Sequence, residues 1–316
     1  MNQKATVSYA GYIPVTSGMP PYKLHKFQEE AIENLGQKAL GADDFAGLLV
    51  IPTGGGKTLV AVHWLLENVI NNNQKVLWIA HRHELLEQVY STVTRCAHSA
   101  VLPKRESFRF RIISGLHDKP VSLKKEDDFV IASKDSLNHG LHYLKHKWLR
   151  YSGEVFLVID EAHHAVAKTY REVIRVVKGT GKRRVKILGL TATPFRTAQN
   201  EQGLLGKIFH DNVVYSIDSS RLIGQGILSK PVIEEPKTHI APAESLTTKD
   251  IQTIENLDQL PPKVARQIVK DKKRNKLIVS HYINNNNQQK FGQLLVFAIN
   301  RIHAVALNKL FNIELN

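Results

Sequence analysis

Three consecutive glycines followed by lysine and threonine are the stretch with the clearest chemistry: residues 48–58 read Leu-Leu-Val-Ile-Pro-Thr-Gly-Gly-Gly-Lys-Thr. The apolar start predicts a buried strand, and the residues from Thr58 to Val69 predict a helix. Glycines allow a tight turn whose N–H groups approach phosphate oxygens, and the helix adds its positive N-terminal end. Lys57 can contact β- and γ-phosphates, and the Thr58 hydroxyl can bind Mg²⁺. The stretch therefore predicts a phosphate-binding loop, in which we assign nucleotide binding to Thr53, Gly54, Gly55, Gly56, Lys57 and Thr58.

Two adjacent carboxylates, Asp160 and Glu161, directly follow the apolar run 155–159. This order places both acids just past the end of a buried strand. Asp160 can hold Mg²⁺ together with Thr58, and Glu161 can orient or deprotonate a water molecule that attacks a γ-phosphate. The alternative is that both acids cap the following helix. A phosphate loop about a hundred residues upstream favours the catalytic interpretation, with Lys57, Asp160 and Glu161 as the catalytic residues.

Two weaker signals accompany these motifs. The apolar run 188–190 ends in Thr191 and Thr193, whose hydroxyls can bond the acidic site and transmit the state of the nucleotide, although an ordinary Thr-Pro turn is the alternative. Gln28 lies in an amphipathic helix predicted over residues 22–35, and its amide offers the donor and acceptor that match an adenine edge. A glutamine that only faces solvent is the alternative there.

Strands and helices alternate through the first two-thirds of the chain. Besides the strand before the phosphate loop, apolar runs predict strands at 75–80, 108–113, 129–132, 155–159 and 185–190. This alternation predicts an α/β fold, a parallel sheet with helices on both faces. Ligands bind such sheets at the carboxyl ends of the strands, where the motifs above fall.

The bulk composition narrows the class of protein. The chain has 316 residues, 42% of them hydrophobic, and a formal net charge of +14, which favours a polyanionic partner such as nucleic acid. Its single cysteine fits a reducing compartment and argues against a structural zinc site. We find no apolar run long enough to span a membrane and no secretory signal. We therefore expect a cytoplasmic, intracellular protein without a membrane partner, nucleoid-associated or nuclear if it acts on DNA.

With these motifs in order, the chain resembles a superfamily 2 helicase of the DEAD/DEAH-box type. The matching stretches are Pro52–Thr58, Asp160-Glu-Ala-His163 and Leu190-Thr-Ala-Thr-Pro194. Ile51 stands where the general phosphate-loop pattern has glycine, but this family commonly has an apolar or small residue there. Finer features resemble the DEAH-like motors related to XPB and to restriction enzymes; these are His163-His164, Thr169-Tyr-Arg-Glu172 and Thr193-Pro-Phe-Arg196.

The resemblance implies a RecA-like P-loop NTPase fold, ATP and Mg²⁺ as cofactors, and ATP hydrolysis coupled to movement on nucleic acid, DNA more than RNA. It implies that Gln28 recognises adenine and that Arg82 and Ser133 contact the nucleic-acid backbone. It also implies that His163 lies between the ATP site and Thr191 or Thr193, as a coupling residue. Partner subunits of a larger repair, restriction or defence complex are possible in such a family.

The same resemblance divides the chain. We expect an N-terminal arm (1–21), a first RecA-like ATP-binding domain (22–233), a connector (234–262) and a partial second RecA-like domain (263–316). In the last, we expect a polar loop at 284–287, a first strand at 293–300 and a helix at 301–311. A basic helix from Lys263 to Arg274 could be a solvated face or a nucleic-acid contact.

The expected arginine-supplying pattern, Gln-x-x-Gly-Arg-x-x-Arg, is not found in the 316 residues. We therefore expect an N-terminal fragment that binds nucleotide but hydrolyses it weakly. Two alternatives stay open: a non-hydrolysing nucleotide-sensing or interaction module, and a P-loop ATPase acting on a small molecule.

Overall fold

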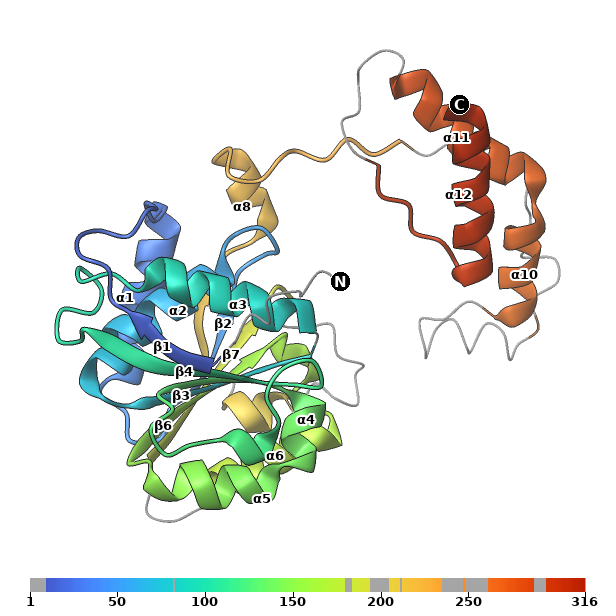
Figure 1. The fold of residues 1–316 in the computed structure, drawn as a ribbon. Coiled ribbons are helices and arrows are strands. Elements are labelled where there is room, and N and C mark those ends of the chain that lie inside the picture. The colour runs from blue at the N-terminus through green and yellow to red at the C-terminus, as the bar shows by residue number, and fades with distance from the viewer. Residues whose placement is uncertain are drawn as a thin grey trace, which may run out of the picture. The chain divides into compact units, whose positions relative to one another are not determined.

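The computed structural model describes residues 10–81, 83–179, 184–193, 205–210, 212–234, 247, 261–286 and 294–315. The chain forms two compact units, Met1–Lys230 and Pro231–Asn316 (Figure 1). We treat each unit by itself. None of the described helices is both long and apolar enough to cross a bilayer.

An eight-stranded sheet forms the centre of the first unit, in the order β1-β4-β5-β3-β6-β7-β2-β8. All neighbouring strands are parallel except β1, which runs antiparallel to β4. The strands are β1 (Ala10–Pro14), β2 (Ala46–Val50), β3 (Lys75–Ala80), β4 (Ser107–Ile113), β5 (Phe129–Ser133), β6 (Glu154–Asp160), β7 (Arg184–Thr191) and β8 (Val213–Ser216).

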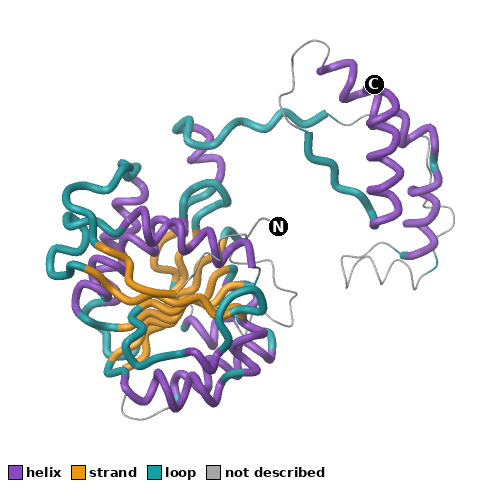
Figure 2. The backbone as a smooth tube through the Cα atoms, in the orientation of Figure 1, coloured by secondary structure: helices purple, strands orange, loops and turns teal. Residues whose placement is uncertain are grey.

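Helices cover both faces of this sheet, as Figure 2 shows with strands in orange between helices in purple. One face packs on α1 (Lys26–Ala39), α2 (Lys57–Asn68) and α3 (His83–Cys96). The other packs on α4 (Lys134–His139), the helical turns that begin with α5 (Leu141–Tyr143), and α6 (Lys168–Lys178). Because both faces are buried, β2, β3 and β5 are apolar along nearly their whole length. This is the α/β architecture that the alternation of strands and helices predicts, and it agrees with the RecA-like lobe that the resemblance implies.

The edges of the sheet differ from the expectation. The segment 1–21 was expected to be an arm, but Ala10–Pro14 is an edge strand whose Ile13 is buried in the core. A short strand, β8, also extends the opposite edge beyond β2. Neither strand has the long apolar run that made the central strands recognisable, because an edge strand needs only one buried residue in two.

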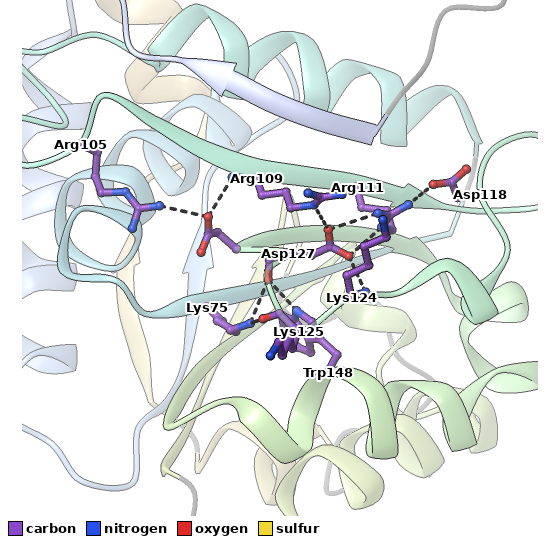
Figure 3. Close-up of polar contacts among 10 residues, drawn as sticks. Lys75, Arg105, Arg109, Arg111, Asp118, Lys124, Lys125, Asp127 and Trp148 are labelled. Carbon is purple, nitrogen blue, oxygen red and sulfur yellow. Dashed lines mark hydrogen bonds and ion pairs between the residues drawn. The ribbon is translucent and has the colours of Figure 1, made fainter.

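A buried charge network ties the amino end of β5 to β4 (Figure 3). The Asp127 carboxylate is completely buried and accepts hydrogen bonds from Arg109 Nε (2.9 Å) and Arg111 Nε (2.7 Å), and from the backbone N–H of Lys124 (2.8 Å). Two further ion pairs complete the network: Arg111 also pairs with Asp118, and Arg105 pairs with Asp128. Its centre, Asp127, lies just before the amino end of β5, away from the carboxyl ends of the parallel strands, so we assign the network to support of the fold.

The second unit, in the described residues, contains α10 (Pro262–Lys270), α11 (Lys272–Asn286) and α12 (Arg301–Leu315). The helix expected at 301–311 is therefore present. The strand expected at 293–300 is wrong for residues 294–300, which form no strand, and Phe297 is 88% exposed. An apolar run becomes a strand only where a neighbouring strand satisfies its backbone groups, and none is described in this unit. The loop expected at 284–287 is helical through Asn286.

Candidate nucleotide-binding site

The loop after β2 is anchored at its start by Ile51. This side chain is completely buried, and the Ile51 N–H donates to the carbonyl of Thr191 at the end of β7 (3.1 Å). The turn closes with a hydrogen bond from Gly55 N–H to the Pro52 carbonyl (2.9 Å). The residue that departs from the general phosphate-loop pattern thus holds the loop against the neighbouring strand.

Gly56 makes the transition from the loop into α2. It is the N-cap of the helix, with φ 82°, a left-handed conformation that side chains disfavour. A Cβ atom at this position would also lie 2.6 Å from Gln28 Nε2. Both observations favour glycine at this position. The loop thus leads directly into the N-terminus of α2, where the free N–H groups of a helix can bind an anion.

Gln28 packs against the loop from α1. It is buried; its Nε2 donates to the Gly55 carbonyl (3.0 Å) and its Oε1 accepts from the His25 N–H (2.9 Å). The glutamine therefore uses one donor and its acceptor to hold the phosphate loop to the start of α1. Its role in recognising adenine stays a prediction.

The two acids lie at the carboxyl end of β6. Asp160 is the last residue of the strand and is buried, and its Oδ1 accepts the Glu161 N–H (3.0 Å). Glu161 adopts φ 50°, an uncommon conformation for a residue with a side chain. Its Oε1 lies 3.1 Å from Lys57 Nζ. The loop lysine and the acid after β6 are thus in direct contact, although 104 positions separate them in the chain.

Burial raises the pKa of the Asp160 carboxyl to about 6. The Lys57 ammonium opposes this effect, and the neighbouring Glu161 carboxylate adds to it. Removing a carboxylate from water disfavours its charged form, and a single lysine shared with Glu161 compensates only in part. Two carboxylates thus share one lysine, and the excess negative charge is what a cation-binding site requires.

A chain of contacts leads from Glu161 to the end of β7. His163 Nδ1 lies 3.5 Å from Glu161 Oε2 and 3.4 Å from Thr191 Oγ1. The Thr191 hydroxyl donates to the Thr193 carbonyl (3.1 Å), so it can accept a hydrogen bond from a protonated His163 Nδ1. His163 thus lies between Glu161 and Thr191. Its coupling role stays a prediction.

These groups border a cavity of about 330 Å³. The loop contributes Thr53, Gly54, Gly56, Lys57 and Thr58, and β6 contributes Asp160 and Glu161. The far wall comes from α3 and was not anticipated: Leu85, Gln88, Thr92 and Arg95. These residues are spaced by three, four and three positions, which places them on one face of a helix. That shared face could have been predicted from the sequence. The cavity has the size of a small-ligand site.

The two residues predicted to contact nucleic acid do not add to this site. Ser133 is buried and its hydroxyl accepts the Ser136 N–H (3.3 Å), so it caps α4. Arg82 lies outside the described residues. Both assignments stay predictions.

Comparison with known proteins gives the family. The model of the family described as "Type III restriction enzyme, res subunit" matches residues 21–196, more than half of the chain and all of the cavity-forming elements. The chain belongs to this family. It is thereby a member of the superfamily 2 helicases, which confirms the resemblance drawn from its motifs.

Individual relatives carry helicase names. The "Putative ATP-dependent helicase IRC3" of Saccharomyces cerevisiae is 25% identical over 301 residues, which cover 91% of this chain and 39% of the relative. The "ATP-dependent DNA helicase mph1" of Aspergillus fumigatus is 24% identical over 268 residues, 79% of this chain and 22% of the relative. The chain therefore spans well under half the length of these relatives. The crystal structure of the UvsW helicase from bacteriophage T4 aligns with 62% of this chain and 61% of its own, at a TM-score of 0.42 and 19% identity.

Proposed function

We propose that this chain is the nucleotide-binding part of an ATP-dependent motor that moves on nucleic acid, with DNA favoured over RNA. The observation that carries the proposal is the convergence of Lys57 and Glu161, 3.1 Å apart, on one cavity with Thr58 and Asp160. Family membership and the name of the mph1 relative, a DNA helicase, support it, as does the net charge of +14.

ATP would place its phosphates on the loop. The N–H groups at the start of α2 and the Lys57 ammonium face the cavity, so they would hold the β- and γ-phosphates. A γ-phosphate on Lys57 competes with the Glu161 carboxylate for the same ammonium. Binding of ATP would therefore free Glu161 to orient the attacking water.

The residues present fit a magnesium ion. Asp160 is a buried carboxylate with a raised pKa, and Thr58 lines the same cavity, which gives the hard oxygen ligands that Mg²⁺ prefers. When bound, the ion would neutralise charge on the phosphate oxygens during transfer. Asp160 and Thr58 would hold it, while Lys57 and Glu161 keep the roles given above.

His163 would report the nucleotide state to the rest of the molecule. Freed from Lys57, the Glu161 carboxylate changes its contact with His163 Nδ1, which also faces Thr191. A shift of the imidazole would move the Thr191 hydroxyl, which donates a hydrogen bond to the Thr193 carbonyl. This connects the catalytic acid with the segment that follows β7.

The test is the rate of ATP hydrolysis with and without single-stranded and duplex DNA and RNA, beside the variants Lys57→Ala and Glu161→Gln. We expect a weak rate of hydrolysis that DNA stimulates, and we expect both variants to abolish it. Lys57→Ala should also weaken ATP binding, whereas Glu161→Gln should retain it. ATP binding indifferent to all four polymers would refute a nucleic-acid motor and favour an ATPase acting on a small molecule. If ATP strengthens polymer binding but is not hydrolysed, the result would fit either a nucleotide-sensing module or a motor whose arginine-supplying residues are not in these 316 residues.

A further inference from the structure

A cluster of exposed cations lies on α10 and on the first turns of α11. The six side chains are Lys263, Arg266, Lys270, Lys272, Lys273 and Lys276, and we call them the α10–α11 basic surface. Asp271 is the one acid between residues 262 and 276, and its carboxylate accepts the Arg274 N–H (2.9 Å). Asp271 therefore caps the start of α11, and among the described residues 262–276 no other acid is present to balance the cations.

The six cations are not paired inside the described part of the second unit. The ion pair found there joins His281 and Glu234 (3.1 Å) and includes none of them. Arg266 and Lys270, and Lys272 and Lys276, also stand four residues apart on their helices, a spacing at which like charges destabilise a helix. A helix face that is merely solvated normally mixes both signs. The one-sided charge costs stability in the free protein and would be offset by a polyanion.

A buried polar contact holds the helices that carry this surface. Asn275 Nδ2 donates to the Val269 carbonyl of α10 (3.0 Å), and its Oδ1 lies 3.0 Å from His303 Nε2 of α12. Both Asn275 and His303 are buried. The three helices are thus joined at one point, which fixes how α10 and α11 present their cations.

The spacing of the cations on α10 fits a row of phosphates. Lys263, Arg266 and Lys270 lie on one face of the helix, and seven residues rise about 10 Å. One DNA strand advances about 3.4 Å per phosphate, so about three phosphates face this length. We propose that the α10–α11 basic surface binds the sugar–phosphate backbone of DNA, as a contact separate from the nucleotide cavity. The choice of DNA rests on the proposed function.

This contact holds the polymer without reading its sequence. Lysine and arginine side chains neutralise phosphates and release counterions, which makes binding steeply dependent on salt. Located outside the family-matched residues 21–196, the surface would keep DNA bound while the nucleotide site turns over. Its contribution should therefore be present without ATP.

The experiment measures DNA affinity against salt concentration in the full 316-residue chain without nucleotide. The probe is a fluorescently labelled duplex, with a single strand and an RNA duplex as parallel arms, followed by anisotropy. The test variant is Lys263→Gln/Arg266→Gln/Lys270→Gln. The matched control, Lys145→Gln/Arg150→Gln/Lys178→Gln, removes the same charge from exposed positions of the first unit. A third variant, Lys263→Arg/Lys270→Arg, retains the charge.

We expect the slope of log K against log salt to fall in magnitude by about 2–3 in the test variant on duplex DNA. The control and the charge-retaining variant should keep the wild-type slope. Equal slopes in the test and control variants, with DNA still bound, would overturn this inference and leave the proposed function standing. Failure of the wild-type chain to bind any nucleic acid would instead count against the proposed function. A change in slope confined to the RNA duplex would overturn the assignment to DNA.

Discussion

Replacing Asp127 with alanine should destabilise the first unit more than any change at an exposed charge. The Asp127 carboxylate is completely buried and neutralises Arg111, whose side chain is 5% exposed, together with Arg109, which is 19% exposed (Figure 3). It also accepts the Lys124 N–H. Alanine would leave the buried Arg111 guanidinium with only the partly exposed Asp118, and it would remove the acceptor of the part-buried Lys124 N–H.

The size of the loss follows from these contacts. Removing one partner of a buried ion pair costs about 3–5 kcal/mol, because the remaining charge stays desolvated. Arg109 can turn towards water, so the loss at that side is smaller. Asp118→Asn is the matched control: Asp118 is 38% exposed and Arg111 keeps Asp127, so we expect a loss below about 1 kcal/mol. The double variant Arg111→Met/Asp127→Leu should recover part of the loss, since it removes both buried charges.

Tryptophan fluorescence during urea unfolding measures this loss in the first unit alone. All three tryptophans, Trp64, Trp78 and Trp148, are buried in that unit. With a denaturant slope of about 2–3 kcal/mol per molar urea, Asp127→Ala should lower the midpoint by roughly 1–2 M. A folded Asp127→Ala protein with a midpoint equal to that of Asp118→Asn would refute the reasoning that a buried carboxylate holds β4 to β5.

Three further predictions test the site and the second unit. Gly56→Ala should weaken binding of a fluorescent ATP analogue about tenfold, because a left-handed residue with a side chain costs about 1–2 kcal/mol. The control Gly41→Ala, which has open space around its Cβ, should bind the analogue as the wild type does. An equal loss of affinity in both variants would contradict the loop geometry. Cys96 should resist alkylation by iodoacetamide until the first unit unfolds, because burial raises its pKa to about 11; rapid labelling of folded protein would be inconsistent with this. Burial and the nearby Arg274 lower the pKa of His303, whose Nδ1 accepts the Ile299 N–H (3.3 Å). The unfolded chain then binds more protons than the folded one, so the second unit should lose stability as pH falls below 6.5 and keep it at higher pH. The loss is measured as faster proteolysis within residues 262–315. His303→Gln should remove this pH dependence, and an unchanged dependence in that variant would assign it to another group.

The motif residues and the central strands were predictable because local sequence determines them. Glycines before Lys57, and an unbroken apolar run before Asp160, produce the same loop and the same buried strand in any parallel sheet. The helices α1, α2 and α3 carry their own 3.6-residue pattern, so spacing alone shows that Leu85, Gln88, Thr92 and Arg95 share one helix face. That this face borders the cavity follows only from the structure.

Other features escaped because they depend on neighbours. The edge strand Ala10–Pro14 exists through pairing with β4, and the apolar run at 294–300 forms no strand because no described strand lies beside it. The hydrogen bonds of the Gln28 amide to Gly55 and His25 were not predicted, because they depend on where α1 packs. Pairing and packing of this kind are non-local, and propensity does not encode them.

Local sequence predicts the chemical groups of this protein: a phosphate loop, two acids after a strand, and an excess of basic residues. Which groups meet was decided only by the tertiary structure. The parallel order β3-β6-β7-β2 brings the carboxyl ends of β6, β7 and β2 together, and thereby sets Glu161 against Lys57 and His163 against Thr191. The physical reason is that a sheet buried on both faces places its strands by shared packing and hydrogen bonding, over separations in the chain that no local pattern records.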